Sequence, residues 1–158
     1  MGINYTSGDA TQPTGEGPKV IVHICNDIGG WGRGFVVAIS KRWSEPEQRY
    51  RAWHRGGEAA PFALGEIQLV QVSEALWVAN VIGQRDVRAV GGVPPVRCEA
   101  IRIGLQKVAA EAHRLGASVH MPRIGCGLAG GNWEEVSRIV ERELVNKGVA
   151  VTVYDLPS

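Results

Sequence analysis

"MPRIGCGLAGGNW", residues 121–133, is the stretch that decides the fold we expect. It places four glycines within seven positions, between a short apolar strand and a helix: Gly125, Gly127, Gly130 and Gly131. A glycine inside a helix costs about 1 kcal/mol relative to alanine, and glycine also weakens strands. The stretch therefore predicts a loop whose bare backbone something approaches closely.

A second glycine-rich loop, CNDIGGWGRG at residues 25–34, follows the β-branched run KVIVHICN at 19–26. Both loops are predicted to follow a strand and to precede a helix. Backbone N–H groups without side chains form an anion nest, and a helix N-terminus adds about half a positive charge. The two loops together favour a phosphate-bearing ligand. The alternative is that each is only a tight strand-to-helix turn.

Two common nucleotide-binding classes fit these loops poorly. Neither loop runs into Gly-Lys-Ser or Gly-Lys-Thr, which disfavours nucleoside triphosphate chemistry. The stretch GWGRGF opens no proper βαβ unit with a ribose-binding acid about 20 residues further on, which disfavours a dinucleotide fold.

Hydrophobic spacing predicts the other elements. We expect strands at 2–7, 19–26, 66–72, 75–82, 117–122 and 149–156, and helices at 35–43, 46–55, 97–115 and 132–147. Ser73 and Glu74 alone separate two of the strands, which predicts an antiparallel hairpin. The order of elements predicts an α/β fold with three α/β/α layers and a mixed central sheet. Ligands of such sheets bind outside the carboxyl ends of strands.

Composition limits the function classes. The 158 residues suit a single domain spanning 1–158, and 44% hydrophobic with 21% charged residues is ordinary for a globular protein. A net charge of +1 without a run of like charge argues against nucleic acid or a membrane as the main partner. There is no secretory signal, no apolar run of the about 20 residues that span a bilayer, and no metal-ligand spacing. We therefore expect a cytoplasmic monomer with three free cysteines and neither metal nor cofactor.

Three stretches resemble the macrodomain family. GDAT at 8–11 is similar to its Gly-Asp-Ile-Thr signature, and VHICNDIGGWGRGFVVAI at 22–39 resembles its first ligand loop and following helix. MPRIGCGLAGGNWEEV at 121–136, with VTVYDL at 151–156, resembles the branch that contains the terminal ADP-ribose protein glycohydrolase. The resemblance covers nearly the whole chain. It implies that the ligand is ADP-ribose, whose diphosphate and ribose lie against bare backbone.

The resemblance also implies which residues bind the ligand. Asp9 would accept a hydrogen bond from the adenine amino group beside the Ala10 N–H, and Tyr154 would stack on the adenine with Leu156 nearby. Two segments would wrap the diphosphate and approach the distal ribose: Gly32, Arg33 and Gly34 from the first loop, and Arg123, Ile124, Gly125, Cys126, Gly127, Leu128 and Ala129 from the second.

Several of these residues also have an ordinary structural explanation. Asp9 fits an Asx turn, and Tyr154 fits packing at a strand end. Cys126 fits a small turn residue better than a nucleophile, because no histidine is visibly dedicated to it. Two histidines inside apolar strands, His23 and His120, are predicted to be hydrogen-bonded core residues. Arg123 fits either a structural role or the offset of phosphate charge.

Whether the chain is an enzyme depends on two positions. The related glycohydrolase uses a lysine and an aspartate where this sequence has Gln84 and Ala129. Neither residue can serve as a cation or exchange a proton, so that mechanism does not apply. An ester at C1″ of the distal ribose is already activated, and Asn26, Asp27 and Gln84 would orient water or ribose hydroxyls. We therefore expect removal of mono-ADP-ribose from proteins, most plausibly from Glu or Asp esters. The alternatives are a phosphatase for ADP-ribose 1″-phosphate and a non-catalytic reader of ADP-ribose.

Overall fold

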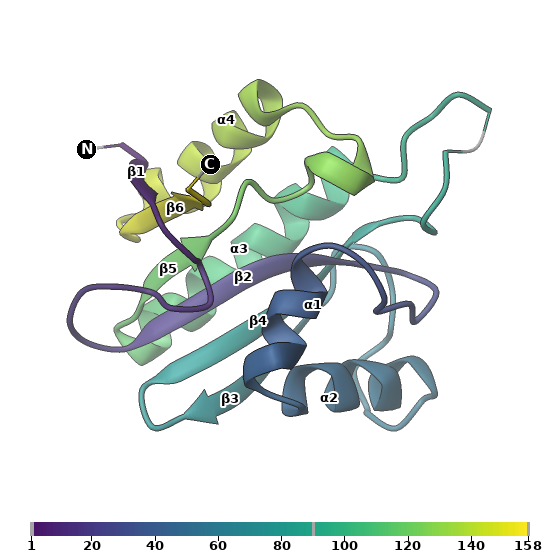
Figure 1. Ribbon diagram of the computed structural model, residues 1–158, viewed down its shortest axis with the longest axis horizontal. Helices are drawn as coiled ribbons and strands as arrows, with labels where there is room; N and C mark the ends of the chain where they lie inside the picture. Colours follow the sequence, from purple (N-terminus) through teal and green to yellow (C-terminus); the bar gives the residue numbers. More distant parts are fainter. Residues whose placement is uncertain (1, 90, 158) are drawn as a thin grey trace.

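Six strands and four α-helices form three layers in the computed structural model, which describes residues 2–89 and 91–157 (Figure 1). In chain order the elements, with η for a short 3-10 helix, are β1 (Asn4–Ser7), β2 (Lys19–Asn26), α1 (Phe35–Arg42), α2 (Glu45–His54), β3 (Ile67–Ser73), β4 (Leu76–Gln84), α3 (Cys98–Leu115), β5 (Ser118–Met121), η1 (Gly127–Ala129), α4 (Trp133–Glu143), η2 (Val145–Lys147) and β6 (Val151–Asp155).

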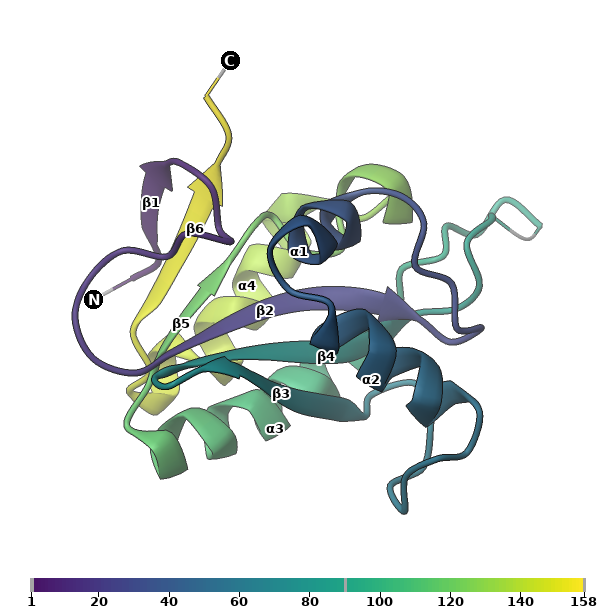
Figure 2. The same ribbon diagram turned by 60° about the horizontal axis from the view of Figure 1, so that its bottom comes forward.

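The strands form one mixed sheet in the order β1-β6-β5-β2-β4-β3. All neighbouring pairs are parallel except β3 and β4, which form the antiparallel hairpin that the sequence predicts. Helices α1 and α2 cover one face of the sheet, and α3 and α4 cover the other (Figures 1 and 2). The predicted three-layer α/β/α fold with a mixed sheet is therefore confirmed.

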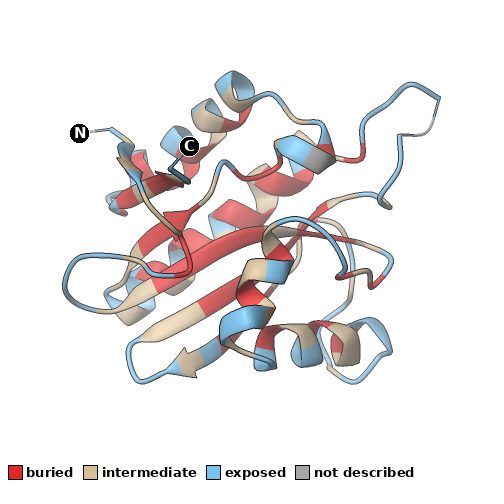
Figure 3. Cartoon of the chain, in the orientation of Figure 1, coloured by how far each residue is buried: buried red, intermediate tan, exposed pale blue. Residues whose placement is uncertain are grey.

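The central strand β2 supplies both halves of the core. Val20 and Val22 pack toward α3 and α4, whereas Ile21 and Cys25 pack toward α1 and α2. This follows from the pleat of a strand, which sends alternate side chains to opposite faces. Because both faces are covered, the strand reads as a continuous apolar run, and Figure 3 shows it buried over most of its length.

Helix ends follow local chemistry. Asn132 caps α4, because its side-chain oxygen accepts the N–H groups of Glu134 and Glu135 at 2.8 and 3.4 Å. The prediction of a single helix over residues 132–147 is wrong in its second part. The structure ends α4 at Glu143 and continues with η2, a tighter turn that keeps Leu144 and Val145 buried.

The parallel strands determine where a site can form. Five of them end at one edge of the sheet: β1 at Ser7, β2 at Asn26, β4 at Gln84, β5 at Met121 and β6 at Asp155. Both glycine-rich loops begin there, as do the segments that follow β1, β4 and β6. Residues far apart in sequence are therefore brought to the same edge.

Candidate functional site

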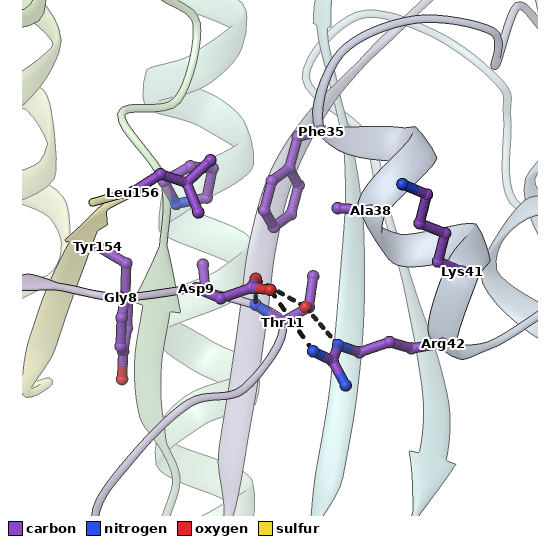
Figure 4. Close-up of a pocket in the computed structure, with 11 residues that line it drawn as sticks. Gly8, Asp9, Thr11, Phe35, Ala38, Lys41, Arg42, Tyr154 and Leu156 are labelled. Atoms are coloured by element: carbon purple, nitrogen blue, oxygen red, sulfur yellow. Dashed lines mark hydrogen bonds and ion pairs between the residues drawn. The ribbon is translucent and has the colours of Figure 1, made fainter. Parts of the chain in front are cut away.

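Three adjoining pockets form one groove along this edge. The proximal pocket, of about 450 Å³, lies between the segment after β1, helix α1 and the end of β6 (Figure 4). The middle pocket, of about 500 Å³, lies between the two glycine-rich loops, and the distal pocket, of about 430 Å³, lies between the first loop and the chain after β4. Neighbouring pockets share lining residues: Phe35 and Pro122 for the first two, and Ile24, Arg33, Val36 and Gln84 for the last two.

The predicted site residues are distributed over the whole groove. Asp9, Ala10, Tyr154 and Leu156 line the proximal pocket; Arg33, Gly34, Gln84, Arg123, Ile124, Gly125, Cys126, Gly127 and Ala129 line the middle pocket; Asn26, Gly32, Arg33 and Gln84 line the distal pocket. Asp27 is absent from all three linings, and the side chain of Leu128 lies outside what the structure describes.

Asp9 combines the two roles that the sequence left open. Its Oδ1 accepts the backbone N–H and the hydroxyl of Thr11 at 2.8 and 2.7 Å, which makes the Asx turn. Its Oδ2 lies 3.5 Å from the Arg42 guanidinium, at the edge of the proximal pocket (Figure 4). Burial raises the pKa of Asp9, but the Thr11 and Arg42 contacts outweigh burial and hold it below its ordinary value. The carboxylate is therefore an ionised acceptor with one oxygen open to a ligand.

Aromatic and apolar groups form much of the rest of the proximal pocket, which Lys41 also lines. Tyr154 is 4% exposed, and its hydroxyl bonds to the Thr14 N–H at 2.9 Å and to His120 Nδ1 at 2.8 Å. It therefore supplies a fixed wall and little open ring face. Phe35, which the sequence did not single out because it reads as a core position, is half-buried and lines the pocket from the start of α1, whereas Leu156 lines it from just after the end of β6 (Figure 4).

The glycines of the second loop serve two purposes. A side chain at Gly131 would meet the Gly125 carbonyl oxygen at 2.1 Å, and the Gly131 N–H donates to that same oxygen at 2.8 Å. Gly131 therefore fits the alternative interpretation of this loop, in which the glycines serve only a tight strand-to-helix turn. Gly127, with a φ of 68°, has nothing within 4 Å of its Cβ position and lines the middle pocket. There the backbone is open to an incoming group.

The two arginines assigned to the ligand differ in the structure. Arg123 forms a two-point ion pair with Asp155, at 2.7 and 2.9 Å, and its guanidinium carbon lies 5.4 and 5.5 Å from the ring centroids of Tyr5 and Trp133. Its charge is thus already matched by the protein. Arg33 is exposed, lines the middle and distal pockets, and makes no ion pair with any residue that the structure describes.

Cys126 has no features of a nucleophile. Its Sγ contacts the Ile124 carbonyl oxygen at 3.6 Å, and burial raises the pKa of the thiol despite the nearby Arg123 charge. A thiol that stays protonated is a weak nucleophile, which agrees with the prediction of a small turn residue.

The side chain of Asn26 holds the first glycine-rich loop in place through hydrogen bonds to its backbone. Its Oδ1 accepts the N–H groups of Ile28 and Gly30 at 3.1 and 2.9 Å and the Tyr50 hydroxyl at 2.9 Å, while its Nδ2 donates to the Gly30 carbonyl at 2.9 Å. Only one N–H of this amide is left for water or a ribose hydroxyl. The structure therefore gives Asn26 mainly a positioning role.

The other two residues assigned to catalysis both bond to Asp86, in the chain after β4, although Asp27 directly follows β2 and Gln84 is the last residue of β4. Asp27 Oδ1 accepts the Asp86 N–H at 2.7 Å and so holds the turn that follows this strand. Gln84 donates from Nε2 to the Asp86 carbonyl at 2.9 Å and lines both the middle and the distal pockets. Ala129 lines the middle pocket as well, so the two positions that replace the Lys/Asp dyad share one cavity.

The two strand histidines are core residues, as predicted. His23 is 1% exposed and bonds through Nε2 to Asn80 Oδ1 at 2.5 Å, and His120 joins Ser118 at 2.7 Å as well as Tyr154. Burial lowers the pKa of each histidine to about 4. Both are therefore neutral at pH 7.

The residues that the structure describes form neither a membrane-spanning helix nor a cluster of metal ligands. None of the helices in this part of the chain is long and apolar enough to cross a membrane. The residues described also contain no group of three or more His, Cys, Asp or Glu side chains placed to hold a metal ion.

Comparison with known proteins gives several strong structural likenesses. No family model matches the chain. The solved structure of a macrodomain protein from Streptomyces coelicolor is 52% identical in sequence, superimposes with a TM-score of 0.86, and matches over 97% of this chain and 98% of that one.

Curated relatives are more distant or much longer. A mouse chromodomain-helicase-DNA-binding protein 1-like is 33% identical over 164 residues, but the match covers 98% of this chain and only 18% of that protein. The bovine ADP-ribose glycohydrolase OARD1 is 25% identical over 157 residues, which cover 98% of this chain and 91% of that protein.

Proposed function

Because this chain belongs to the macrodomain family, we propose that it binds ADP-ribose along the groove and releases it from modified proteins by cleaving esters to Glu or Asp. The observation that supports this most is the division of the groove into three joined pockets of different chemistry. ADP-ribose has three corresponding parts, namely adenosine, diphosphate and distal ribose. Each pocket also has a volume typical of a small-molecule site.

The chemistry of the pockets gives the ligand a direction. Adenine fits the proximal pocket, where Asp9 Oδ2 can accept from its amino group and Phe35 offers a ring. The diphosphate fits the middle pocket, against the open backbone at Gly127 and near Arg33, which forms no ion pair with any described residue. The distal ribose then reaches the distal pocket, with Gln84 at the boundary.

The lack of described carboxyl side chains in the lining of this part of the groove favours an ester as substrate. Among the described residues, no Asp or Glu side chain lines the middle or distal pocket. A carboxylate leaves C1″ without needing a proton, whereas an amine or an alkoxide needs one. Positioning of water and ribose, together with electrostatic support of the oxocarbenium-like transition state, is what such a groove can supply.

A relative supports the same ligand and reaction type. The bovine protein that matches over most of its own length carries the name ADP-ribose glycohydrolase. From that name we carry over to this protein only the ligand, ADP-ribose, and the class of reaction, hydrolysis at the ribose. We do not extend its catalytic residues, because Gln84 and Ala129 replace the lysine and the aspartate expected there.

The same replacement favours a second candidate function, a reader that binds ADP-ribose without turnover. Gln84 and Ala129 line the middle pocket but provide neither a nucleophile nor a proton donor. In a reader, the groove would retain the nucleotide while the modified protein stays intact.

Turnover separates these functions. We expect purified protein to release ADP-ribose from a glutamate-modified protein faster than the ester hydrolyses in the same buffer without protein. Tight binding with no release over hours would assign the protein as a reader. Release of inorganic phosphate from ADP-ribose 1″-phosphate, without ester cleavage, would assign it as a phosphatase and contradict the proposal.

A further inference from the structure

We propose that Arg88, which lines the distal pocket, binds the departing carboxylate of the modified Glu or Asp and makes the groove selective for acyl-linked ADP-ribose. Arg88 lies in the segment between β4 and α3 and lines the distal pocket together with Val87 and Gly32. The inference rests on the proposed function and assigns the leaving group a specific contact.

The cations along the groove can be matched to the parts of the ligand. At the proximal end, Arg42 faces Asp9 at 3.5 Å. Next to the middle pocket, Arg123 is already paired with Asp155, whereas Arg33 lines both the middle and the distal pockets. Of the three pockets, Arg88 lines only the distal one. Arg33 is thus the cation placed for the diphosphate, and Arg88 lies beyond it.

Arg88 has no anion to match within the described structure. It is exposed and forms no ion pair with a residue that the structure describes. The two nearby acids are both engaged with backbone N–H groups, since Asp27 accepts from Asp86 at 2.7 Å and Asp86 accepts from Val87 at 2.6 Å. ADP-ribose carries its negative charge in the diphosphate. An anion at Arg88 must therefore come from beyond C1″.

The leaving group has the matching chemistry. When the bond between C1″ and the ester oxygen breaks, its electron pair stays on the departing carboxylate. Water adds to C1″ and gives up a proton to solvent, so the products are ADP-ribose and a free Glu or Asp side chain. A guanidinium can donate two parallel hydrogen bonds to a carboxylate. Arg88 would therefore stabilise negative charge that appears only as the bond breaks, which accelerates the step without tightening nucleotide binding.

The test compares two arginines of the same segment. Arg85 is exposed, lies three residues from Arg88 and lines none of the three pockets, so Arg85→Gln is the matched control. We expect Arg88→Gln to lower kcat for a glutamate-linked ADP-ribosyl peptide about 10- to 100-fold, while the Kd for free ADP-ribose stays within twofold. Arg88→Lys should recover part of the loss, and Arg85→Gln should have wild-type kcat.

The rate should also depend on the acidity of the leaving group. Without Arg88, charge on the departing carboxylate is less stabilised, so kcat for a series of carboxylate esters should fall more steeply with leaving-group pKa in Arg88→Gln than in wild type. Equal losses in Arg88→Gln and Arg85→Gln, or a matching loss of affinity for free ADP-ribose, would overturn the inference.

Failure of the proposed function is distinguishable from failure of this inference. A wild-type protein that binds ADP-ribose without turnover contradicts the hydrolase. The role of Arg88 is then decided by product binding, because Arg88→Gln should weaken the binding of a free glutamate-containing peptide to the ADP-ribose-loaded protein while the Kd for ADP-ribose stays unchanged. Unchanged affinity for that peptide in Arg88→Gln would refute the contact.

Discussion

The two oxygens of Asp9 illustrate how one side chain serves both fold and ligand. Oδ1 closes the turn through Thr11, and Oδ2 remains at the pocket edge near Arg42. The sequence indicated both uses, because an Asp before a Thr fits an Asx turn and also matches a family signature. At this scale the two interpretations are compatible, since each uses a different atom.

Substitution of Asp9 should separate these two uses. Asp9→Asn keeps an Oδ1 that can accept from Thr11 but places an amide donor where adenine presents its own amino group. We expect its affinity for ADP-ribose to fall about 10- to 100-fold by calorimetry, with a nearly unchanged Tm. Asp9→Ala should lose affinity and also lower Tm, because the turn loses its acceptor. Wild-type affinity in Asp9→Asn would show that Asp9 does not contact the ligand.

At the scale of the element, the second glycine-rich loop combines a closed part and an open part. Gly131 is needed where the loop contacts its own backbone at the Gly125 carbonyl, and Gly127 faces open space beside the middle pocket. A glycine count in the sequence cannot distinguish these cases, because both require a missing side chain. The difference comes from how the loop folds back on itself.

Two alanine substitutions should therefore have different effects. Gly131→Ala places a methyl group 2.1 Å from the Gly125 oxygen, so we expect a loss of more than about 2 kcal/mol in the free energy of unfolding by urea. Gly127→Ala should cost about 1 kcal/mol for its left-handed backbone and should mainly weaken ADP-ribose binding. If Gly127→Ala binds the nucleotide as wild type does, the ligand does not approach this backbone.

The elements that the sequence predicts well are those fixed by local periodicity. The β3–β4 hairpin, the cap at Asn132 and the covered strand β2 follow from spacing within a few residues. The site is harder to predict from the sequence, because Arg123 contacts Asp155, and Asn26 contacts Tyr50, only once the tertiary structure has formed. Neither partner can be recognised from the sequence around the residue it contacts, so the family resemblance assigned both residues to the ligand.

At the scale of the whole molecule, two buried histidines link stability to pH. His23 and His120 have a pKa of about 4 in the folded protein, because burial disfavours their charged form. In the unfolded chain a histidine titrates near pH 6.5. Between these values the unfolded state binds more protons, so stability is complete above pH 6.5 and is lost as pH falls toward 4.

The free energy of unfolding should therefore fall on acidification. From pH 7 to pH 5 we expect a loss of about 2 kcal/mol for each of the two histidines, measured by urea unfolding at both pH values. His120→Asn removes one of the two titrating groups and should halve the pH dependence. A free energy of unfolding that stays constant over this range would contradict the burial of neutral imidazoles.

The central claim is that the two glycine-rich loops hold ADP-ribose between them through backbone N–H groups, and amide NMR tests it most directly. On titration with ADP-ribose we expect shifts of the amide signals of residues 29–34 and 124–131, with those of residues 8–11. Signals at the far end of α3, near His113, and in η2, near Lys147, should not move. If saturating ADP-ribose leaves both loops unshifted, or shifts appear only elsewhere, the groove is not the binding site.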